Sequence, residues 1–171
     1  MKEFPFESNK KVKLEKLEAG FLPKEIYQQA HENLVQFCHD ILVEYKGKFL
    51  LVKRSNFPAK DVWWSLGGRV KRGISTEASA KLKVKEECHL EVTKIIFVDF
   101  ARTYFQTDPF GHGKGTDTVN ALYFARAVGT LKLDNLHSSP LLLGKEDYSP
   151  SFRSALHPYM QHFMDLCMEY P

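Results

Sequence analysis

The pattern of apolar and polar positions divides the chain into short β-rich segments and longer segments with helical spacing. Residues 35–45 and 48–55 are rich in β-branched, aromatic and aliphatic side chains, and they flank residues 46–47, a Lys-Gly pair that suits a short hairpin turn. Residues 92–105 and 118–128 have the same character and predict two more strands. Together these segments predict a β-sheet.

Apolar residues at helical spacing also predict a helix near each end of the chain. Pro23 suits the first turn of a helix over residues 22–34. Residues 151–170 repeat apolar side chains every three or four positions, which predicts one final helix. Residues 56–66 and 129–150 show no such period, so we expect a loop in the first and irregular structure in the second.

A third helix is predicted in the middle of the chain. It should begin near Ser75, because serine is a good N-cap, and end near His89. At 100° per residue, Ala80, Val84 and Cys88 fall on one side, which we expect to be the core face.

The order of these elements predicts helices packed on a mixed sheet, in an α/β or α+β layer arrangement. A length of 171 residues suits one domain, and an apolar share of 43% is enough for a sizeable core. Residues 1–21 are charge-rich and predict an N-terminal arm. Residues 22–171 then form the single domain.

Charge and cysteine content indicate which kinds of ligand and which cellular compartment suit this protein. The formal net charge is +3, and the basic residues are spread along the chain, which disfavours nucleic acid as a partner and suits a small anionic ligand. Three cysteines match no zinc-binding spacing, so we expect reduced, buried thiols. No apolar run approaches the ~20 residues of a membrane span, and the N-terminus lacks the apolar stretch of a signal peptide. We therefore expect a cytoplasmic protein with no membrane contact.

Residues 67–90, GGRVKRGISTEASAKLKVKEECHL, carry the clearest chemical signal. A glycine pair lets the backbone approach a ligand closely and can turn a carbonyl, that of Gly67, toward a metal. Glu87 on the following helix adds a hard carboxylate, the ligand type that Mg²⁺ prefers when it bridges a protein to phosphates. Nearby arginines can form bidentate hydrogen bonds with phosphate oxygens. The segment therefore indicates a divalent-metal site for a diphosphate.

The same segment resembles the signature of the Nudix hydrolases, G-x5-E-x7-R-E-U-x-E-E-x-G-U, in which U is a bulky aliphatic residue. The matching positions are Gly68, Val84, Glu86, Glu87 and Leu90. The signature has Glu, Arg, Glu and Gly where this chain has Ile74, Leu82, Lys83 and His89. Compared with the family signature, this segment is therefore degenerate.

Flanking residues are especially similar to the GDP-mannose mannosyl hydrolase branch of that family. Residues 50–58, LLVKRSNFP, and residues 67–70, GGRV, carry this similarity. The resemblance implies a Nudix-type α/β/α sandwich with a mixed sheet, a homodimer, and hydrolysis of a nucleoside diphosphate sugar.

The resemblance also implies how a metal is held. Glu87 matches the glutamate that this branch keeps as a metal-binding side chain, and the Gly67 carbonyl is expected beside it. Glu86 is a further candidate ligand, although the branch does without it. Mg²⁺ is the expected cofactor, with Mn²⁺ as the other candidate.

Four residues are implied in substrate binding and catalysis. Arg54, Arg69 and Asp40 match positions that contact the sugar nucleotide, and Arg69 would also stabilise the leaving group. His137 aligns with the histidine that activates water against the sugar carbon. The alternative for each is an ordinary surface, strand or loop residue without a function, and the sequence leaves both interpretations open.

Two other functions stay open at this point. One is cleavage of a nucleotide pyrophosphate with both Glu86 and Glu87 on the metal, and the other is a catalytically weak protein that binds nucleotide sugars. Lys83 favours the second, because an ammonium one helical turn from Glu87 repels a divalent cation. Our hypothesis is that Lys83 pairs with Glu87 and partly replaces the charge of the metal.

Overall fold

A seven-stranded mixed sheet forms the centre of the molecule, and the computed structural model describes residues 1–20 and 22–170. Its main path runs β5-β4-β3-β8-β7, while β6 pairs with β3 and β9 pairs with β4. Strands β3 and β8 are parallel and the other pairs are antiparallel, which confirms the predicted mixed sheet. The strands are β3 (Gln36–Tyr45), β4 (Lys48–Arg54), β5 (Trp63–Trp64), β6 (Leu66–Arg69), β7 (Glu91–Phe105), β8 (Thr116–Val128) and β9 (His137–Leu143).

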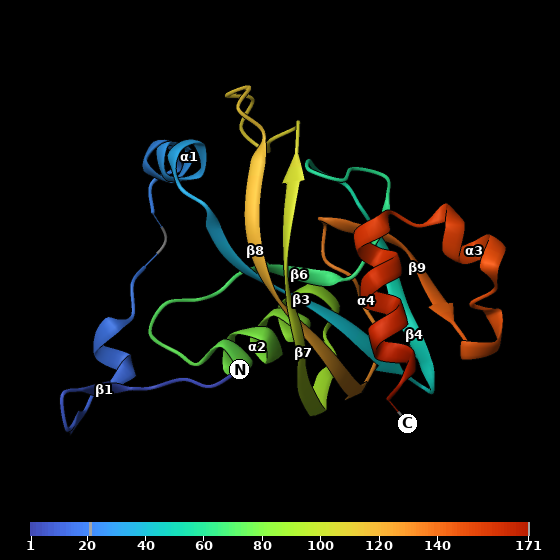
Figure 1. Ribbon diagram of the computed structural model, residues 1–171, viewed down its shortest axis with the longest axis horizontal. Coiled ribbons are helices and arrows are strands. Elements are labelled where there is room, and N and C mark those ends of the chain that lie inside the picture. Colours follow the sequence, from blue (N-terminus) through green and yellow to red (C-terminus); the bar gives the residue numbers. More distant parts are fainter. Residues whose placement is uncertain (21, 171) are drawn as a thin grey trace.

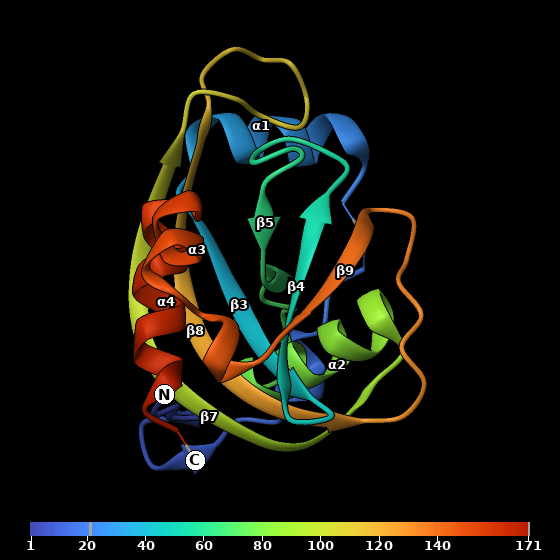
Figure 2. The same cartoon turned by 90° about the vertical axis from the view of Figure 1, so that its right-hand side faces the viewer.

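Helices cover both faces of this sheet, as the two views in Figure 1 and Figure 2 show. Helix α2 (Thr76–Cys88) packs on one face and α4 (Pro158–Met168) on the other, with the short α3 (Pro150–Ala155) beside it. Each interface buries its own apolar cluster. The chain therefore adopts the expected α/β/α sandwich.

Helix α2 follows the sequence prediction closely. The Ser75 hydroxyl accepts a hydrogen bond from the Ala78 N–H at 3.1 Å, so it caps the first turn as expected. Val84 and Cys88 are fully buried on the predicted core face. His89 ends the helix in the left-handed conformation, with φ of 58°. Local capping and helical period were therefore sufficient to predict this element.

Two segments that we expected to be irregular contain strands instead. Residues 56–66 include β5, which pairs with β4, and residues 129–150 include β9, which pairs with the other edge of β4. Strand β5 has only two residues, and the partners of β9 on β4 lie 83 (Arg54 and His137) to 94 (Phe49 and Leu143) positions away in the chain. The local pattern of side chains therefore carried no signal for them.

The single helix predicted over residues 151–170 is wrong, because the structure has two helices there. The break falls at His157, whose backbone is extended with ψ of 139°, immediately before Pro158. Proline lacks an N–H and disfavours helical geometry in the residue that precedes it. Apolar spacing continues across the break, which is why the pattern resembled one helix.

The N-terminal segment lies against the rest of the chain through polar contacts near its start and through aromatic contacts of its helix. It contains β1 (Phe6–Glu7), β2 (Lys10–Lys11), the 3₁₀ turn η1 (Leu14–Leu17) and α1 (Lys24–Asn33). A carboxylate oxygen of Glu3 accepts a hydrogen bond from the Thr76 N–H at 2.7 Å, at the start of α2.

None of the helices in the described part of the chain has the length and apolarity that a membrane crossing requires.

Candidate functional site

Gly67 and Glu87, which we expected to meet at a metal, do lie together. Gly67 is on β6, and its N–H donates a hydrogen bond to Oε2 of Glu87 at 3.1 Å. A side chain at Gly67 would collide with the Asp40 carboxylate and with the backbone oxygen of His39 on β3, so only glycine fits there. Gly67 contacts Glu87 through its N–H, and the expected orientation of its carbonyl toward a metal stays a prediction.

A second pair of residues, Asp134 and His137, completes this buried group. The Asp134 N–H donates to the Glu87 backbone oxygen at 2.9 Å, which ties the loop before β9 to the end of α2. Nδ1 of His137 donates to the Asp134 carboxylate at 2.8 Å, and Nε2 then faces Glu87, 3.9 Å from Oε2. One donor atom from each of the three residues lies within 4.8 Å of the other two.

Asp134 was missed by the sequence analysis. Its spacing of three residues from His137 could have drawn attention, but two polar residues in a segment without a predicted element carry little weight. The connection to Glu87 depends on β9, which starts at His137 and pairs with the Arg54 end of β4.

Burial dominates the electrostatics of Glu87. Its side chain is 7% exposed, and removal from water raises the pKa of the carboxyl to about 8. The Lys83 ammonium and the Gly67 N–H act in the opposite direction, because both favour the charged form. A carboxyl held this far from water is stabilised in its ionised form by a nearby cation.

Lys83 and Glu86 lie on the solvent side of this group. The Lys83 ammonium is 3.3 Å from Glu86 and 3.9 Å from Oε1 of Glu87, so the structure brings together the pair that we inferred from their spacing. The Glu86 side chain is 53% exposed and lies outside the buried group. Of the two adjacent glutamates, Glu87 alone belongs to it.

The donor set fits a divalent cation. Two carboxylates, from Glu87 and Asp134, supply the oxygen ligands that Mg²⁺ and Mn²⁺ prefer, and Nε2 of His137 lies beside them. The Lys83 ammonium, 3.9 Å from Oε1 of Glu87, would repel a cation bound to this carboxylate.

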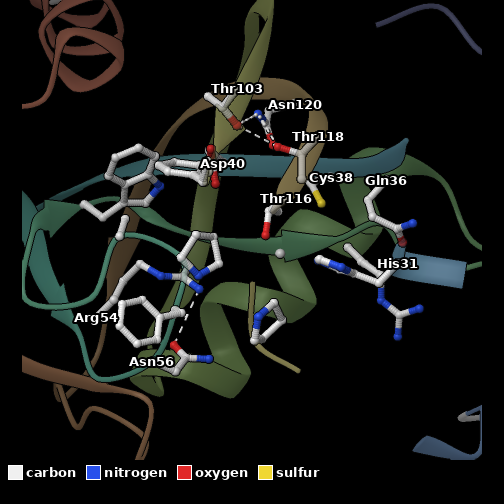
Figure 3. A pocket seen from close by; sticks show the side chains of 18 of the residues that line it. His31, Gln36, Cys38, Asp40, Arg54, Asn56, Thr103, Thr116, Thr118 and Asn120 are labelled. Atoms are coloured by element: carbon white, nitrogen blue, oxygen red, sulfur yellow. Dashed lines mark hydrogen bonds between the residues drawn. The ribbon is translucent and has the colours of Figure 1, made fainter. Parts of the chain in front are cut away.

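A cavity of about 340 Å³ lies at one end of the sheet (Figure 3). Glu87, Asp134 and His137 are not among the described residues that line it, but Arg54, the strand partner of His137, and Gly68, next to Gly67, are. On the face that α4 covers, Leu42 and Leu122 are fully buried. Toward the cavity, the same face of β3 and β8 changes to polar side chains, with Asp40 on β3 and Asn120 on β8. Phe57 lies on the rim. Aromatic walls over a polar floor are typical of a site for a small organic ligand.

The polar floor is rigidly held. The Asn120 amide nitrogen donates to the hydroxyl groups of Thr103 and Thr118 at 3.2 and 3.1 Å, and these two hydroxyls bond to each other at 2.7 Å (Figure 3). Asn120 is 3% exposed, and in residues 1–20 and 22–170 no donor pairs with its amide oxygen. That oxygen is available to a ligand.

Asp40, expected to contact substrate, lines the cavity but is already engaged. Its carboxylate accepts a hydrogen bond from the Tyr159 hydroxyl of α4. Burial raises the pKa of Asp40 to about 6, and the bond from Tyr159 opposes that rise. The residue therefore also anchors the last helix to the cavity wall.

The two arginines expected to bind phosphate both line the cavity, in different settings. Nε of Arg54 is buried, and no acceptor for it is found in the part of the chain that the structure describes. Arg54 is also the strand partner of His137, so it connects the cavity to the buried group. Arg69 is exposed at the rim, with its guanidinium 3.7 Å from the centre of the Tyr27 ring.

Helix α1 and the loop over residues 106–115 lie side by side at one end of the sheet (Figure 2), and both contribute residues to the cavity lining. Phe110 of the loop packs edge-on against Tyr27 of α1, with ring centres 5.1 Å apart. Nδ1 of His31 lies 2.9 Å from Nε2 of His112. The sequence gave no indication that α1 would be the partner of this loop.

Comparisons with known proteins agree on one family. A family model described as the NUDIX domain matches residues 40–148. No curated protein matched the chain by sequence.

Several solved structures share the fold at low sequence identity. A MutT NUDIX hydrolase from Burkholderia pseudomallei has a TM-score of 0.61 at 16% identity, covering 78% of this chain and 98% of its own. The NUDIX domain of Shewanella oneidensis NrtR, complexed with ADP ribose, has a TM-score of 0.53 at 17% identity, covering 74% and 86%. A bifunctional NMN adenylyltransferase/ADP ribose pyrophosphatase from Francisella tularensis, complexed with AMP and a manganese ion, has 0.59 at 14% identity, covering 85% and 45%.

Proposed function

Because this chain belongs to the Nudix family, we propose that it is a divalent-cation-dependent hydrolase of a nucleoside diphosphate sugar, similar to the GDP-mannose mannosyl hydrolases. One observation carries the proposal. The cavity and the buried group of Glu87, Asp134 and His137 meet at Arg54, for whose buried Nε the described residues offer no acceptor. A guanidinium with a free N–H at such a junction suits a phosphate that extends from the cavity toward the carboxylates.

The cavity would hold the nucleoside end of the substrate. Its aromatic residues offer surfaces on which a base can stack, and the Asn120 amide oxygen offers a fixed acceptor for a base or ribose donor. Arg69 at the rim would contact the diphosphate from the side opposite Arg54. Asp40 would contact the substrate while it holds Tyr159.

Glu87, with Asp134, would hold Mg²⁺ or Mn²⁺, which when bound withdraws negative charge from the diphosphate. The Gly67 carbonyl remains a predicted further ligand. Glu86, which the sequence also offered as a ligand, is half-exposed and pairs with Lys83, so we do not place it on the metal. His137 donates Nδ1–H to Asp134, so its Nε2 lone pair is free to accept a proton.

These roles define the proposed reaction. As water attacks the anomeric carbon, its proton passes to Nε2 of His137. The new carbon–oxygen bond replaces the bond from that carbon to the diphosphate, and the nucleoside diphosphate leaves with the electron pair. Arg54 and Arg69 would stabilise the charge on the leaving group.

Product analysis tests this function. Nucleoside diphosphate sugars, including GDP-mannose, and nucleoside triphosphates are incubated with the protein, with and without Mg²⁺ or Mn²⁺. We expect a nucleoside diphosphate and free sugar, dependent on the cation and lost in Glu87→Gln. Nucleoside monophosphate plus sugar phosphate would instead identify cleavage within the diphosphate. Binding of the sugar nucleotide without turnover above the Glu87→Gln control would identify a binding protein.

A further inference from the structure

The side chain of Lys83 lies in the space between the glycine turn and the two glutamates. Its Cε is 3.6 Å, and its ammonium 3.9 Å, from the position that a Cβ on Gly68 would take, so the lysine lies directly against the glycine turn. The ammonium is 3.3 Å from Oε2 of Glu86 and 3.9 Å from Oε1 of Glu87. Lys83 thus carries a positive charge into the space where the glycine pair faces the helix.

The two oxygens of Glu87 face different surroundings. Oε2 accepts the hydrogen bond from the Gly67 N–H and faces His137, whereas the nearest charge to Oε1 is the Lys83 ammonium. A divalent ion bound by Glu87 would therefore lie within a few ångströms of a fixed positive charge, a distance at which repulsion in a partly buried site is strong.

We propose that Lys83 is a resident cation that competes with a divalent metal for Glu87, so that metal binding requires the lysine to move away. This inference rests on the proposed function, in which Glu87 binds a divalent metal. The lysine has a place to go, because Glu86 is half-exposed and already within ion-pair distance. Glu86 would then hold the displaced ammonium on the solvent side, in place of ligating the metal itself.

Titration of the full-length protein with Mn²⁺, following free Mn²⁺ by electron paramagnetic resonance, tests the inference without any need for turnover. Lys83→Gln removes the charge, and we expect it to bind Mn²⁺ at least about tenfold more tightly than the natural chain. Lys83→Arg keeps the charge and should bind as weakly as the natural chain.

Lys81→Gln is the matched control. Lys81 lies on the same helix and pairs with Glu77 at 2.7 Å on the exposed side, so its loss changes the net charge equally and should leave Mn²⁺ affinity nearly unchanged. Circular dichroism of each variant verifies the fold.

The outcomes separate this inference from the function on which it rests. Equal, measurable Mn²⁺ affinity in Lys83→Gln and the natural chain overturns the role of Lys83 and leaves the metal site intact. A gain in Lys81→Gln as large as that in Lys83→Gln overturns it too, because the effect would then be one of net charge. Absence of Mn²⁺ binding in every variant overturns the proposed metal site, and the inference with it.

Discussion

The cavity and the buried group of Glu87, Asp134 and His137 lie side by side but are built from different chemistry. The cavity floor consists mainly of neutral polar groups that bond to one another, as Asn120 does with its two threonines. The buried group consists of titratable side chains whose charges need a partner, and Lys83 is a partial one. Binding and chemistry should therefore respond separately to substitution: changes in the floor alter KM, and changes in the group alter kcat.

The largest effect is expected from Glu87→Gln, which keeps the shape of the side chain but removes its charge. We expect kcat to fall by roughly a thousandfold, with KM changed little, because the loss is confined to charge stabilisation in the reaction. Steady-state kinetics on the substrate found by product analysis measures this. Glu86→Gln is the control, and its kcat should stay close to that of the natural chain. An equal fall in both variants would place Glu86 in the reacting group.

The next largest effect concerns the proton acceptor. His137→Gln should lower kcat by about a hundredfold, the usual contribution of a general base. Asp134→Asn should lower it less, since the ring stays in place but loses the carboxylate that fixes its tautomer. Comparison of kcat with KM in both variants measures this, and a change confined to KM would refute the assignment.

A third prediction uses the raised pKa of Glu87. In the folded protein the Glu87 carboxyl has a pKa of about 8, whereas in the unfolded chain its pKa is 4.5. The folded state therefore holds this proton more tightly, and the proton's contribution to stability is complete below pH 4.5 and is lost as the pH rises to 8. In metal-free buffer, the free energy of unfolding should fall by roughly 3 to 4 kcal/mol between pH 5 and 8. Urea unfolding at several pH values measures this, and Glu87→Gln should show a flatter profile.

The smallest effect is expected at the junction of the two regions. Arg54→Met should raise KM by about tenfold, since a forked contact to phosphate is lost. Its stability should not fall, because a buried N–H without an acceptor is removed. Arg126→Met, which breaks an ion pair with Glu44 at 3.0 Å, is the control, and it should leave KM unchanged. If KM also stays unchanged in Arg54→Met, the phosphate does not reach this junction.

Sequence alone was sufficient for the elements whose signals are local. Helix α2, with its cap at Ser75 and its buried stripe, depends on residues three and four apart, and the β3–β4 hairpin depends on a two-residue turn. The glycine pair and Glu87 were also found from sequence, because they lie at the two ends of one turn–helix unit. Even the pairing of Lys83 with Glu87 followed from helical spacing.

Only the tertiary structure decided the remainder of the site. Asp134 and His137 join Glu87 because β9 pairs with β4, a contact between residues about 85 positions apart that no local pattern encodes. The cavity floor combines alternate residues from β3, β7 and β8, so it exists only once the strands are in register. Its cover, Tyr27 against Phe110, likewise requires α1 and a distant loop to meet in space. Neighbouring residues determine short-range geometry, whereas a site assembled from several strands depends on which strands pair.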